Sequence, residues 1–360
     1  MIEAIAEKVR NDERLTPEEG LTLLTSDKAE EVAALADEAR RRKVGDTVYY
    51  ASTVHIQPTN LCELSCPMCS FYAKPGWKKA WFLTPDQAMT KVEKAYQTGL
   101  TEVHVVGGLW RECDLSYYQE LFTRIKALDP EIHIKALTPV EYDFLAKLHG
   151  LPVEEVLEQM MGWGLGSLPG GGAEILVEEI RKQVAPQKIT SEEYLAIHKI
   201  AHNLGLPSNV TMLFGHVEGP EHIIAHLCKV RELQDETGGF RTFVPLKYHT
   251  ENNALGKRKK RLKPPKNLAL VYAVSRLMLD NVRNLKVLWK YVGLDTAKQL
   301  LNCGGNDLSS TYDEEMIIEL AGSIKEQMTT KWMDEMIYEI GRKPMLIHSG
   351  HHYEEELVLT

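Results

Sequence analysis

Short β-like strings alternate with longer helical strings from residue 54 onward, and this alternation constrains the fold more than any other feature. Strands that alternate with helices form parallel βαβ units. Eight such units over about 260 residues predict an α/β fold, a (β/α)8 TIM barrel. A doubly wound open sheet is the competing architecture, and it usually places G-x-G-x-x-G after its first strand. The expected strands, the last two weaker, are residues 54–57, 102–106, 132–137, 166–168, 208–214, 241–247, 286–289 and 306–308.

Helical patterns flank the alternating region on both sides. In residues 1–45 apolar side chains recur at helical spacing among charges, and Thr16 and Ser26 begin strings typical of helix starts. The last part of the chain reads as a helix followed by a short extended tail. We therefore expect an N-terminal helical extension over residues 1–45, a barrel over 46–325, and a C-terminal helix and tail over 326–360.

Three cysteines follow the first expected strand, where a doubly wound fold would carry its glycines. Cys62, Cys66 and Cys69 have the spacing C-x3-C-x2-C. Three thiolates this close in sequence can bind three irons of a cubane and leave the fourth iron open to a small molecule. Ordinary ferredoxin-type clusters use four cysteines. The lone triplet therefore predicts a [4Fe-4S] cluster that takes part in chemistry.

Two other uses of these cysteines stay open. A structural zinc site needs four ligands, usually a second close pair, whereas Cys113, Cys228 and Cys303 are single and scattered. The thiols could also be buried apolar side chains. A disulfide framework belongs to short secreted chains, which six cysteines in 360 residues do not fit.

Composition and charge limit the classes of partner. A net charge of −9 argues against general nucleic-acid binding. No apolar run reaches the roughly 18 residues of a membrane span, and residues 1–8 do not resemble a secretory signal, so we expect a cytoplasmic protein. The basic run 256–266 contains two prolines and reads as a solvated loop. Attraction of an anionic substrate and nucleic-acid contact are the alternatives for this run.

Polar residues and glycines stand at the ends of most expected strands, where a barrel builds its catalytic site. A lone histidine is more often packed than catalytic, and a glycine-rich turn is usually only a turn. Their repeated placement at strand ends nevertheless favours function. At Gly107 and Gly108 the missing side chains would let backbone groups approach a ligand. The other strand-end candidates are Thr138, Glu174, His216 and His249.

Several strings identify a family. They are His55-x3-Thr59-Asn60-x-Cys62, Gly107-Gly-Leu109, the run from His133 to Glu141, Ser167-Leu-Pro-Gly-Gly-Gly-Ala-Glu174, and the runs 208–216, 231–240 and 276–281. Over about residues 54–325 they resemble the aminofutalosine synthases, radical SAM enzymes of the futalosine route to menaquinone. The string ending at Glu174 is specific to these enzymes among their relatives.

The resemblance implies a reaction. A reduced cluster passes one electron to S-adenosylmethionine, which breaks into methionine and a 5′-deoxyadenosyl radical. The radical adds to the vinyl carbon of 3-[(1-carboxyvinyl)oxy]benzoate. Aryl migration and loss of the carboxyl group then give 6-amino-6-deoxyfutalosine. S-adenosylmethionine is thus a co-substrate, and the implied protein partner is a one-electron donor such as flavodoxin or ferredoxin.

The resemblance also implies roles for single residues. The three cysteines hold the cluster. Arg276 is a candidate for a bidentate contact to a substrate carboxylate, with a helix-surface ion pair as its alternative. His249 is a candidate carboxylate partner or proton donor, with packing as its alternative, and His216 is a further catalytic candidate. Contacts to S-adenosylmethionine or substrate are expected from Met68, Gly107, Gly108, Thr138, Glu174 and Asn209.

The chain departs from the family pattern at three places. Met68 stands where an aromatic residue is common, Trp110 and Arg111 replace His-Pro, and residues 72–80 have no assigned role. Two functional alternatives stay open. One is a related radical SAM enzyme, such as cyclic dehypoxanthine futalosine synthase or an FO synthase subunit. The other is a non-catalytic iron–sulfur electron-transfer protein, whose cluster spectrum would not respond to S-adenosylmethionine.

Overall fold

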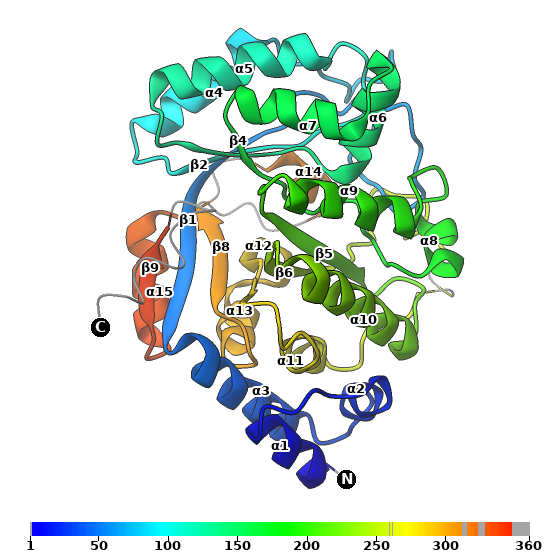
Figure 1. Cartoon of the computed structure of the whole chain (residues 1–360), viewed down its shortest axis with the longest axis vertical. Coiled ribbons are helices and arrows are strands. Elements are labelled where there is room, and N and C mark those ends of the chain that lie inside the picture. Colours follow the sequence, from blue (N-terminus) through cyan, green and yellow to red (C-terminus); the bar gives the residue numbers. More distant parts are fainter. Residues whose placement is uncertain (1, 259, 261, 312–314, 323–327, 348–360) are drawn as a thin grey trace.

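The computed structural model describes residues 2–258, 260, 262–311, 315–322 and 328–347, and it shows parallel strands surrounded by helices (Figure 1). The strands are β1 (Thr47–Ile56), β2 (Glu102–Val105), β3 (His133–Ala136), β4 (Leu165–Ser167), β5 (Ser208–Phe214), β6 (Phe240–Lys247), β7 (Asn284–Leu285), β8 (Asp307–Thr311) and β9 (Lys343–Leu346).

Eight of these strands follow one another around a barrel. One sheet has the order β4-β3-β2-β1-β8, and a second has the order β5-β6-β7. Single parallel bridges join the two sheets, Leu168 to Ser208 beside β4 and β5, and Lys286 to Asp307 beside β7 and β8. This arrangement confirms the expected (β/α)8 fold class and sets aside the open doubly wound sheet.

The expected strands differ in accuracy. Those at 102–106, 132–137, 166–168, 208–214 and 241–247 are confirmed within two residues, whereas β1 begins earlier and β8 ends later than expected. The prediction at 286–289 is wrong: β7 ends at Leu285, and Trp289 already begins a helix. In the C-terminal tail, β9 pairs in parallel with residues 47–50 of β1. Residues 348–360 of that tail lie outside the described residues.

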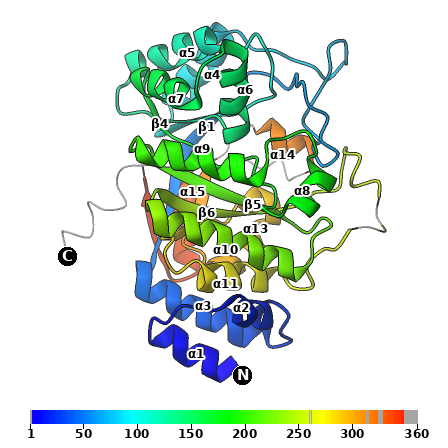
Figure 2. The same ribbon diagram turned by 45° about the vertical axis from the view of Figure 1, so that its right-hand side comes forward.

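Helices cover the outside of the barrel, and the helical extension expected over residues 1–45 lies beneath it as α1, α2 and α3 (Figures 1 and 2). The helices are α1 (Ile2–Arg10), α2 (Pro17–Leu24), α3 (Ala29–Val44), α4 (Pro85–Tyr96), α5 (Leu115–Leu128), α6 (Pro139–His149), α7 (Val153–Gly162), α8 (Glu178–Val184), α9 (Ser191–Asn203), α10 (Pro220–Thr237), α11 (Leu268–Met278), α12 (Trp289–Val292), α13 (Leu294–Leu301), α14 (Met316–Leu320) and α15 (Thr330–Glu339).

Helix starts follow local capping chemistry. Thr16 and Glu19 form the capping box that opens α2, as the sequence predicts. The N-cap of α3 is Lys28, two residues after the expected start at Ser26. The Ser26 hydroxyl accepts a hydrogen bond from the backbone N–H of Lys28. The domain boundaries at residues 45 and 325 stay predictions.

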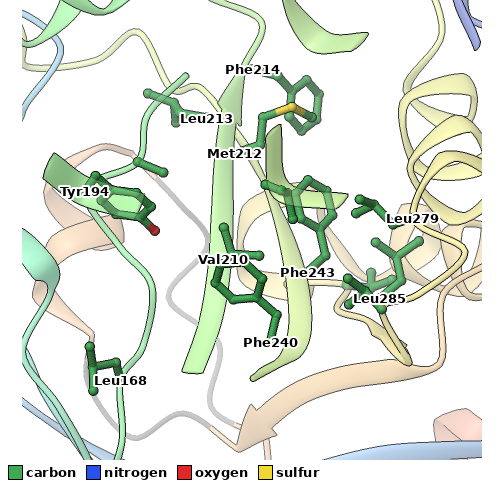
Figure 3. Close-up of a cluster of buried hydrophobic side chains, with 14 of the residues drawn as sticks. Leu168, Tyr194, Val210, Met212, Leu213, Phe214, Phe240, Phe243, Leu279 and Leu285 are labelled. Atoms are coloured by element: carbon green, nitrogen blue, oxygen red, sulfur yellow. The ribbon is translucent and has the colours of Figure 1, made fainter. Parts of the chain in front are cut away.

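Strand β5 shows how alternation separates core from cavity. Val210, Met212 and Phe214 are buried in a cluster with Phe243 of β6 (Figure 3). The intervening residues Asn209, Thr211 and Leu213 line a cavity inside the barrel. Successive side chains of a strand point to opposite faces, so one strand supplies both the packed core and the cavity wall.

Candidate active site

A cavity of about 330 Å³ opens at the carboxyl ends of the strands. This volume is within the range of small-molecule sites. Ten of the twelve residues that the sequence analysis proposed as site residues line the cavity. They are Cys62, Cys66, Met68, Cys69, Gly107, Gly108, Thr138, Glu174, Asn209 and His249.

The loop that carries the cysteines, residues 57–70, is held by neighbouring segments. The light-blue chain that leaves the top of β1 descends toward α8 in both views (Figures 1 and 2). There the Ser65 amide donates to the Gln187 side chain at 2.7 Å, and the Met68 amide donates to the Val184 carbonyl at 3.3 Å. The loop is therefore fixed against the barrel independently of any bound cluster.

The cysteines fit an iron–sulfur cluster. The Leu109 amide lies 3.5 Å from the Cys62 sulfur, and such donors are typical around cluster thiolates. Burial raises the pKa of Cys66 to about 11, although the charge of Lys188 opposes this rise. Since a cluster is bound by thiolates, the positive charge of Lys188 and of bound iron would favour the form of Cys66 that binds. Within the described part of the chain, no three His, Cys, Asp or Glu side chains converge on one metal ion. A cubane does not require this, because each thiolate binds a different iron.

Gly107 and Gly108 line the cavity, but their amides bond within the protein. The Gly107 amide donates to Glu141 Oε1 at 2.9 Å, and the Gly108 amide donates to the Thr59 carbonyl at 2.8 Å. A Cβ atom on Gly108 would lie 2.1 Å from the Leu61 carbonyl oxygen. Glycine is thus required for the close packing of this turn against the cysteine loop.

Thr138 and Glu141 form a capping box at the start of α6, and the Glu141 side chain is buried. Glu141 accepts from the amides of Thr138, at 2.7 Å, and Gly107. Burial raises the pKa of Glu141, although these two hydrogen bonds oppose the rise. The carboxylate therefore links the turn after β2 to the turn after β3.

Glu174 lies beside the cysteines in a strained conformation. Its φ of 50° is in the left-handed region, which is uncommon for a residue with a side chain. Its carboxylate pairs with the Lys188 ammonium at 2.5 Å. Burial alone would lower the pKa of Lys188, but Glu174 and Cys66 outweigh it and the pKa is raised. A cation thus stands next to the proposed cluster.

Two ion pairs lie deeper in the barrel. Lys135 of β3 pairs with Glu102 of β2 at 2.6 Å, and Lys286 pairs with Asp307 at 2.9 Å. Lys135, Lys286 and Glu102 line the cavity.

Two histidines lie between these pairs. The rings of His55 and His104 are 5.2 Å apart and also line the cavity. Burial lowers both of their pKa values, and the Lys135 charge lowers them further. Both imidazoles are therefore neutral at pH 7.

His249 lines the cavity, where one of its ring nitrogens can accept a hydrogen bond from a ligand while the other donates within the protein. Its Nε2 lies 3.1 Å from the carbonyl oxygen of Tyr291. A carbonyl only accepts, so Nε2 carries the proton, and burial lowers the pKa of the ring and keeps it neutral. Nδ1 then offers a lone pair, which suits a ligand O–H or N–H group and not a carboxylate.

The structure does not bring Arg276 to the cavity, which corrects the sequence-based expectation. Arg276 is buried in α11 and donates to the carbonyls of Gly304, at 2.8 Å, and Arg283, at 2.9 Å. It also donates to Asn306 Oδ1 at 2.7 Å. Arg283 and Asn306 directly precede β7 and β8, so the guanidinium lies at the amino ends of the strands, opposite the cysteines.

His216 also lies outside the cavity lining. It is buried in the turn after β5, where Nε2 donates to the Leu213 carbonyl at 3.0 Å and Nδ1 lies 2.9 Å from Glu218. Trp110 and Arg111 do not line the cavity either. Arg111 instead pairs with Glu63 on the surface at 2.9 Å.

Sequence analysis missed the cavity lysines. Glu102 begins β2 and Lys135 lies within β3. Charged residues in such parallel strands are a signal that could have identified them, because these strands are buried on both faces. Lys286 was placed in a strand without a role. Lys188 follows α8 at a position with no local pattern that predicts its contact with Glu174.

Comparisons with known proteins agree with this geometry. The profile of the radical SAM superfamily matches residues 56–228, and the profile of the CofH/MqnC C-terminal region matches residues 237–358. In the described residues, no helix has the length and apolar character needed to cross a membrane.

Two sets of relatives have similar identity. The chain is 36% identical to aminodeoxyfutalosine synthase of Thermus thermophilus over 344 residues, which are 95% of this chain and 92% of that protein. It is also 36% identical over 315 residues to 5-amino-6-(D-ribitylamino)uracil–L-tyrosine 4-hydroxyphenyl transferase of Archaeoglobus fulgidus, which are 87% of this chain and 91% of that protein.

Solved structures support the fold. Methylornithine synthase superimposes with a TM-score of 0.76 at 17% identity, over 95% of this chain and 97% of that one. The hydrogenase maturase HydG of Carboxydothermus hydrogenoformans superimposes with a TM-score of 0.74 at 16% identity, over 98% of this chain and 81% of that one.

Proposed function

This chain is a radical SAM enzyme of the CofH/MqnC family, and from that premise we propose that it makes 6-amino-6-deoxyfutalosine from S-adenosylmethionine and 3-[(1-carboxyvinyl)oxy]benzoate. As a member of this family it takes a small-molecule substrate and an electron donor. The observation that carries the proposal is the part of the cavity lining formed by the segment that follows β4. The string from Ser167 to Glu174, on which the resemblance rests, lines the cavity beside the cysteines through Pro169, Gly171, Gly172 and Glu174.

Cys62, Cys66 and Cys69 would hold the cluster at the mouth of the barrel. When bound, the cluster supplies one electron that splits S-adenosylmethionine into methionine and the 5′-deoxyadenosyl radical. The radical would add to the vinyl carbon of the benzoate ether and the aryl group would migrate from oxygen to carbon. The carboxyl group would then leave as carbon dioxide together with the unpaired electron, which passes to a one-electron acceptor, so that a closed-shell product remains. The protein binds and orients the two substrates and excludes water.

Residues next to the cysteines would bind S-adenosylmethionine. Glu174, which follows β4, and Asn209, near the start of β5, both line the cavity and offer carboxylate and amide groups to ribose or adenine. Met68 can pack its thioether against adenine. His249 Nδ1 would accept a hydrogen bond from a ribose hydroxyl or from the adenine amino group.

Lysines replace Arg276 as the proposed partners of the two substrate carboxylates. Lys135 and Lys286 line the same cavity, and burial acts with the charge of Lys286 to lower the pKa of Lys135. Each ammonium has three donors, so pairing with Glu102 or Asp307 leaves donors for a substrate carboxylate.

The relatives named as tyrosine 4-hydroxyphenyl transferases supply a second candidate function. Their names imply a tyrosine side chain and a ribitylaminouracil as substrates. His249 as a hydrogen-bond acceptor and the paired lysines would suit an amino acid as well as a dicarboxylate.

An anaerobic assay tests the two functions against each other. Reconstituted, dithionite-reduced protein is incubated with S-adenosylmethionine and either 3-[(1-carboxyvinyl)oxy]benzoate or L-tyrosine with 5-amino-6-(D-ribitylamino)uracil. The proposal expects, only with the benzoate ether, a product mass equal to adenosyl plus substrate less the carboxyl group. Turnover of the tyrosine pair alone would replace this proposal with the second function.

A further inference from the structure

Residues 72–83, here called the clamp segment, run alongside the cysteine loop. The Ala73 amide donates to the Asn60 carbonyl at 2.7 Å, and the Cys62 amide donates to the Ala73 carbonyl at 3.1 Å. Farther along, the Asn60 side chain donates to the Lys79 carbonyl at 2.8 Å and accepts from the Trp81 amide at 2.9 Å. Thr59 Oγ1 also donates to the Trp81 carbonyl at 2.6 Å. Thr59 and Asn60, which the family strings contain, therefore attach the clamp segment to the loop.

The side-chain ammonium of Lys74, in the clamp segment, is surrounded by three backbone carbonyl groups of the cysteine loop. It donates to the carbonyl oxygens of Cys62, at 2.8 Å, Glu63, at 2.9 Å, and Leu64, at 3.1 Å. These are three consecutive residues, the first cysteine of the triplet and the two residues that follow it. An ammonium has three donors, and here each has an acceptor from the same turn.

The contacts have a structural and an electrostatic consequence. Three carbonyl dipoles that converge on one point repel each other, and the ammonium removes that repulsion while fixing the backbone that bears the Cys62 thiolate. It also places a positive charge beside the cluster site. Groups that hydrogen-bond to metal ligands or to their supporting backbone orient those ligands, and nearby charge and hydrogen bonds set cluster potentials.

We propose that Lys74 is a positioning residue of the cluster, which holds the first turn of the cysteine loop for iron binding and raises the reduction potential of the bound cluster. The inference rests on the cluster of this enzyme family and not on the identity of the organic substrate. A wrong substrate assignment would leave it unchanged.

Lys74→Met tests the proposal, with Lys78→Met as matched control. Lys78 is an exposed lysine of the same segment. Each protein is reconstituted anaerobically, and iron release to a chelator and the EPR-monitored reduction potential are measured without organic substrate. We expect Lys74→Met to lose iron about 10–100-fold faster and to have a more negative potential, while Lys78→Met behaves as the parent protein.

Lys74→Arg separates positioning from folding. Arginine keeps the charge and several donors, so this variant should recover most of the cluster retention and the parent potential. The melting temperature of each cluster-free variant shows whether the barrel itself is affected. A Lys74→Met protein with the parent's iron release and potential would overturn the proposal, and so would a Lys74→Arg protein as defective as Lys74→Met.

Discussion

Buried cations at the two ends of the barrel are held in different ways. At the amino ends of the strands, arginines donate to backbone carbonyls. Arg276 bonds to Gly304, and Arg342 bonds to Leu301 at 2.7 Å and Gly305 at 2.9 Å. Burial, together with the charges of Arg40 and Arg342, lowers the pKa of Arg276 to about 9. These side chains fasten loops together, and neither Arg276 nor Arg342 lines the cavity.

In the cavity, lysines pair with carboxylates instead. Lys135, Lys188 and Lys286 each contact one carboxylate and also line open volume. A flexible ammonium with three donors can keep its partner and still bind a ligand. A buried cation therefore indicates a functional role only when we know whether it lies at the amino ends or at the carboxyl ends of the barrel strands.

The largest effect expected at the mouth of the barrel follows from Cys66→Ala. Loss of one of three ligands should abolish cluster binding and reductive cleavage of S-adenosylmethionine. Iron analysis and the yield of methionine measure both. Cys228→Ala, which changes a half-buried cysteine on α10, should keep the parent's iron content. Parent-like iron content in Cys66→Ala would contradict the assignment of the site.

At the amino ends of the strands, Arg276→Met should lower the stability of the protein and leave substrate binding unchanged. The carbonyls of Gly304 and Arg283 lose their charged donor, so we expect the free energy of unfolding to fall by about 2–4 kcal/mol. Urea titration measures this change. Arg41→Met is the control, because Arg41 is exposed and its ion pairs are with Asp37 and Asp46 nearby. A raised KM for substrate with unchanged stability would return Arg276 to the active site.

In the cavity, the double variant Lys286→Met/Asp307→Asn should affect binding more than stability. It removes a buried pair without changing net charge. A lost charged hydrogen bond corresponds to about 1.5–3 kcal/mol, so the KM for the benzoate ether should rise roughly 10–100-fold. The exposed pair Lys147→Met/Asp143→Asn on α6 should leave KM unchanged. Equal KM values in the two double variants would remove Lys286 from the substrate site.

The smallest effect concerns pH. Burial lowers the pKa of His226 to about 3, and its Nδ1 accepts from the Leu176 amide at 3.0 Å. The unfolded imidazole takes up a proton below about pH 6.5 and the native one does not, so stability falls as pH drops from about 6.5 toward 3.

His226→Gln should reduce the loss of stability between pH 7 and pH 5 by about 2 kcal/mol. Urea titrations at both pH values measure the difference. His149→Gln, at an exposed position, should leave the loss unchanged. An unaltered pH dependence in His226→Gln would contradict the lowered pKa, because it would mean that the native imidazole takes up a proton as readily as the unfolded one.

Local patterns predicted much of the fold and part of the site. Strand alternation and the C-x3-C-x2-C spacing are local signals, and they located the barrel and the cluster loop. The error at residues 286–289 arose because β7 is short and its continuation is a single bridge. Arg276 was misplaced for a related reason: its partners Gly304 and Asn306 follow it by about 30 residues, and no local pattern predicts that contact.

The fate of the adenosyl group tests the central claim most directly. S-adenosylmethionine labelled with ¹³C in its ribose is supplied with 3-[(1-carboxyvinyl)oxy]benzoate to the reduced enzyme, and the products are separated and analysed by mass spectrometry. Our account predicts that the label is covalently joined to the aryl-containing product, with little free 5′-deoxyadenosine. Label found only in 5′-deoxyadenosine would contradict radical addition.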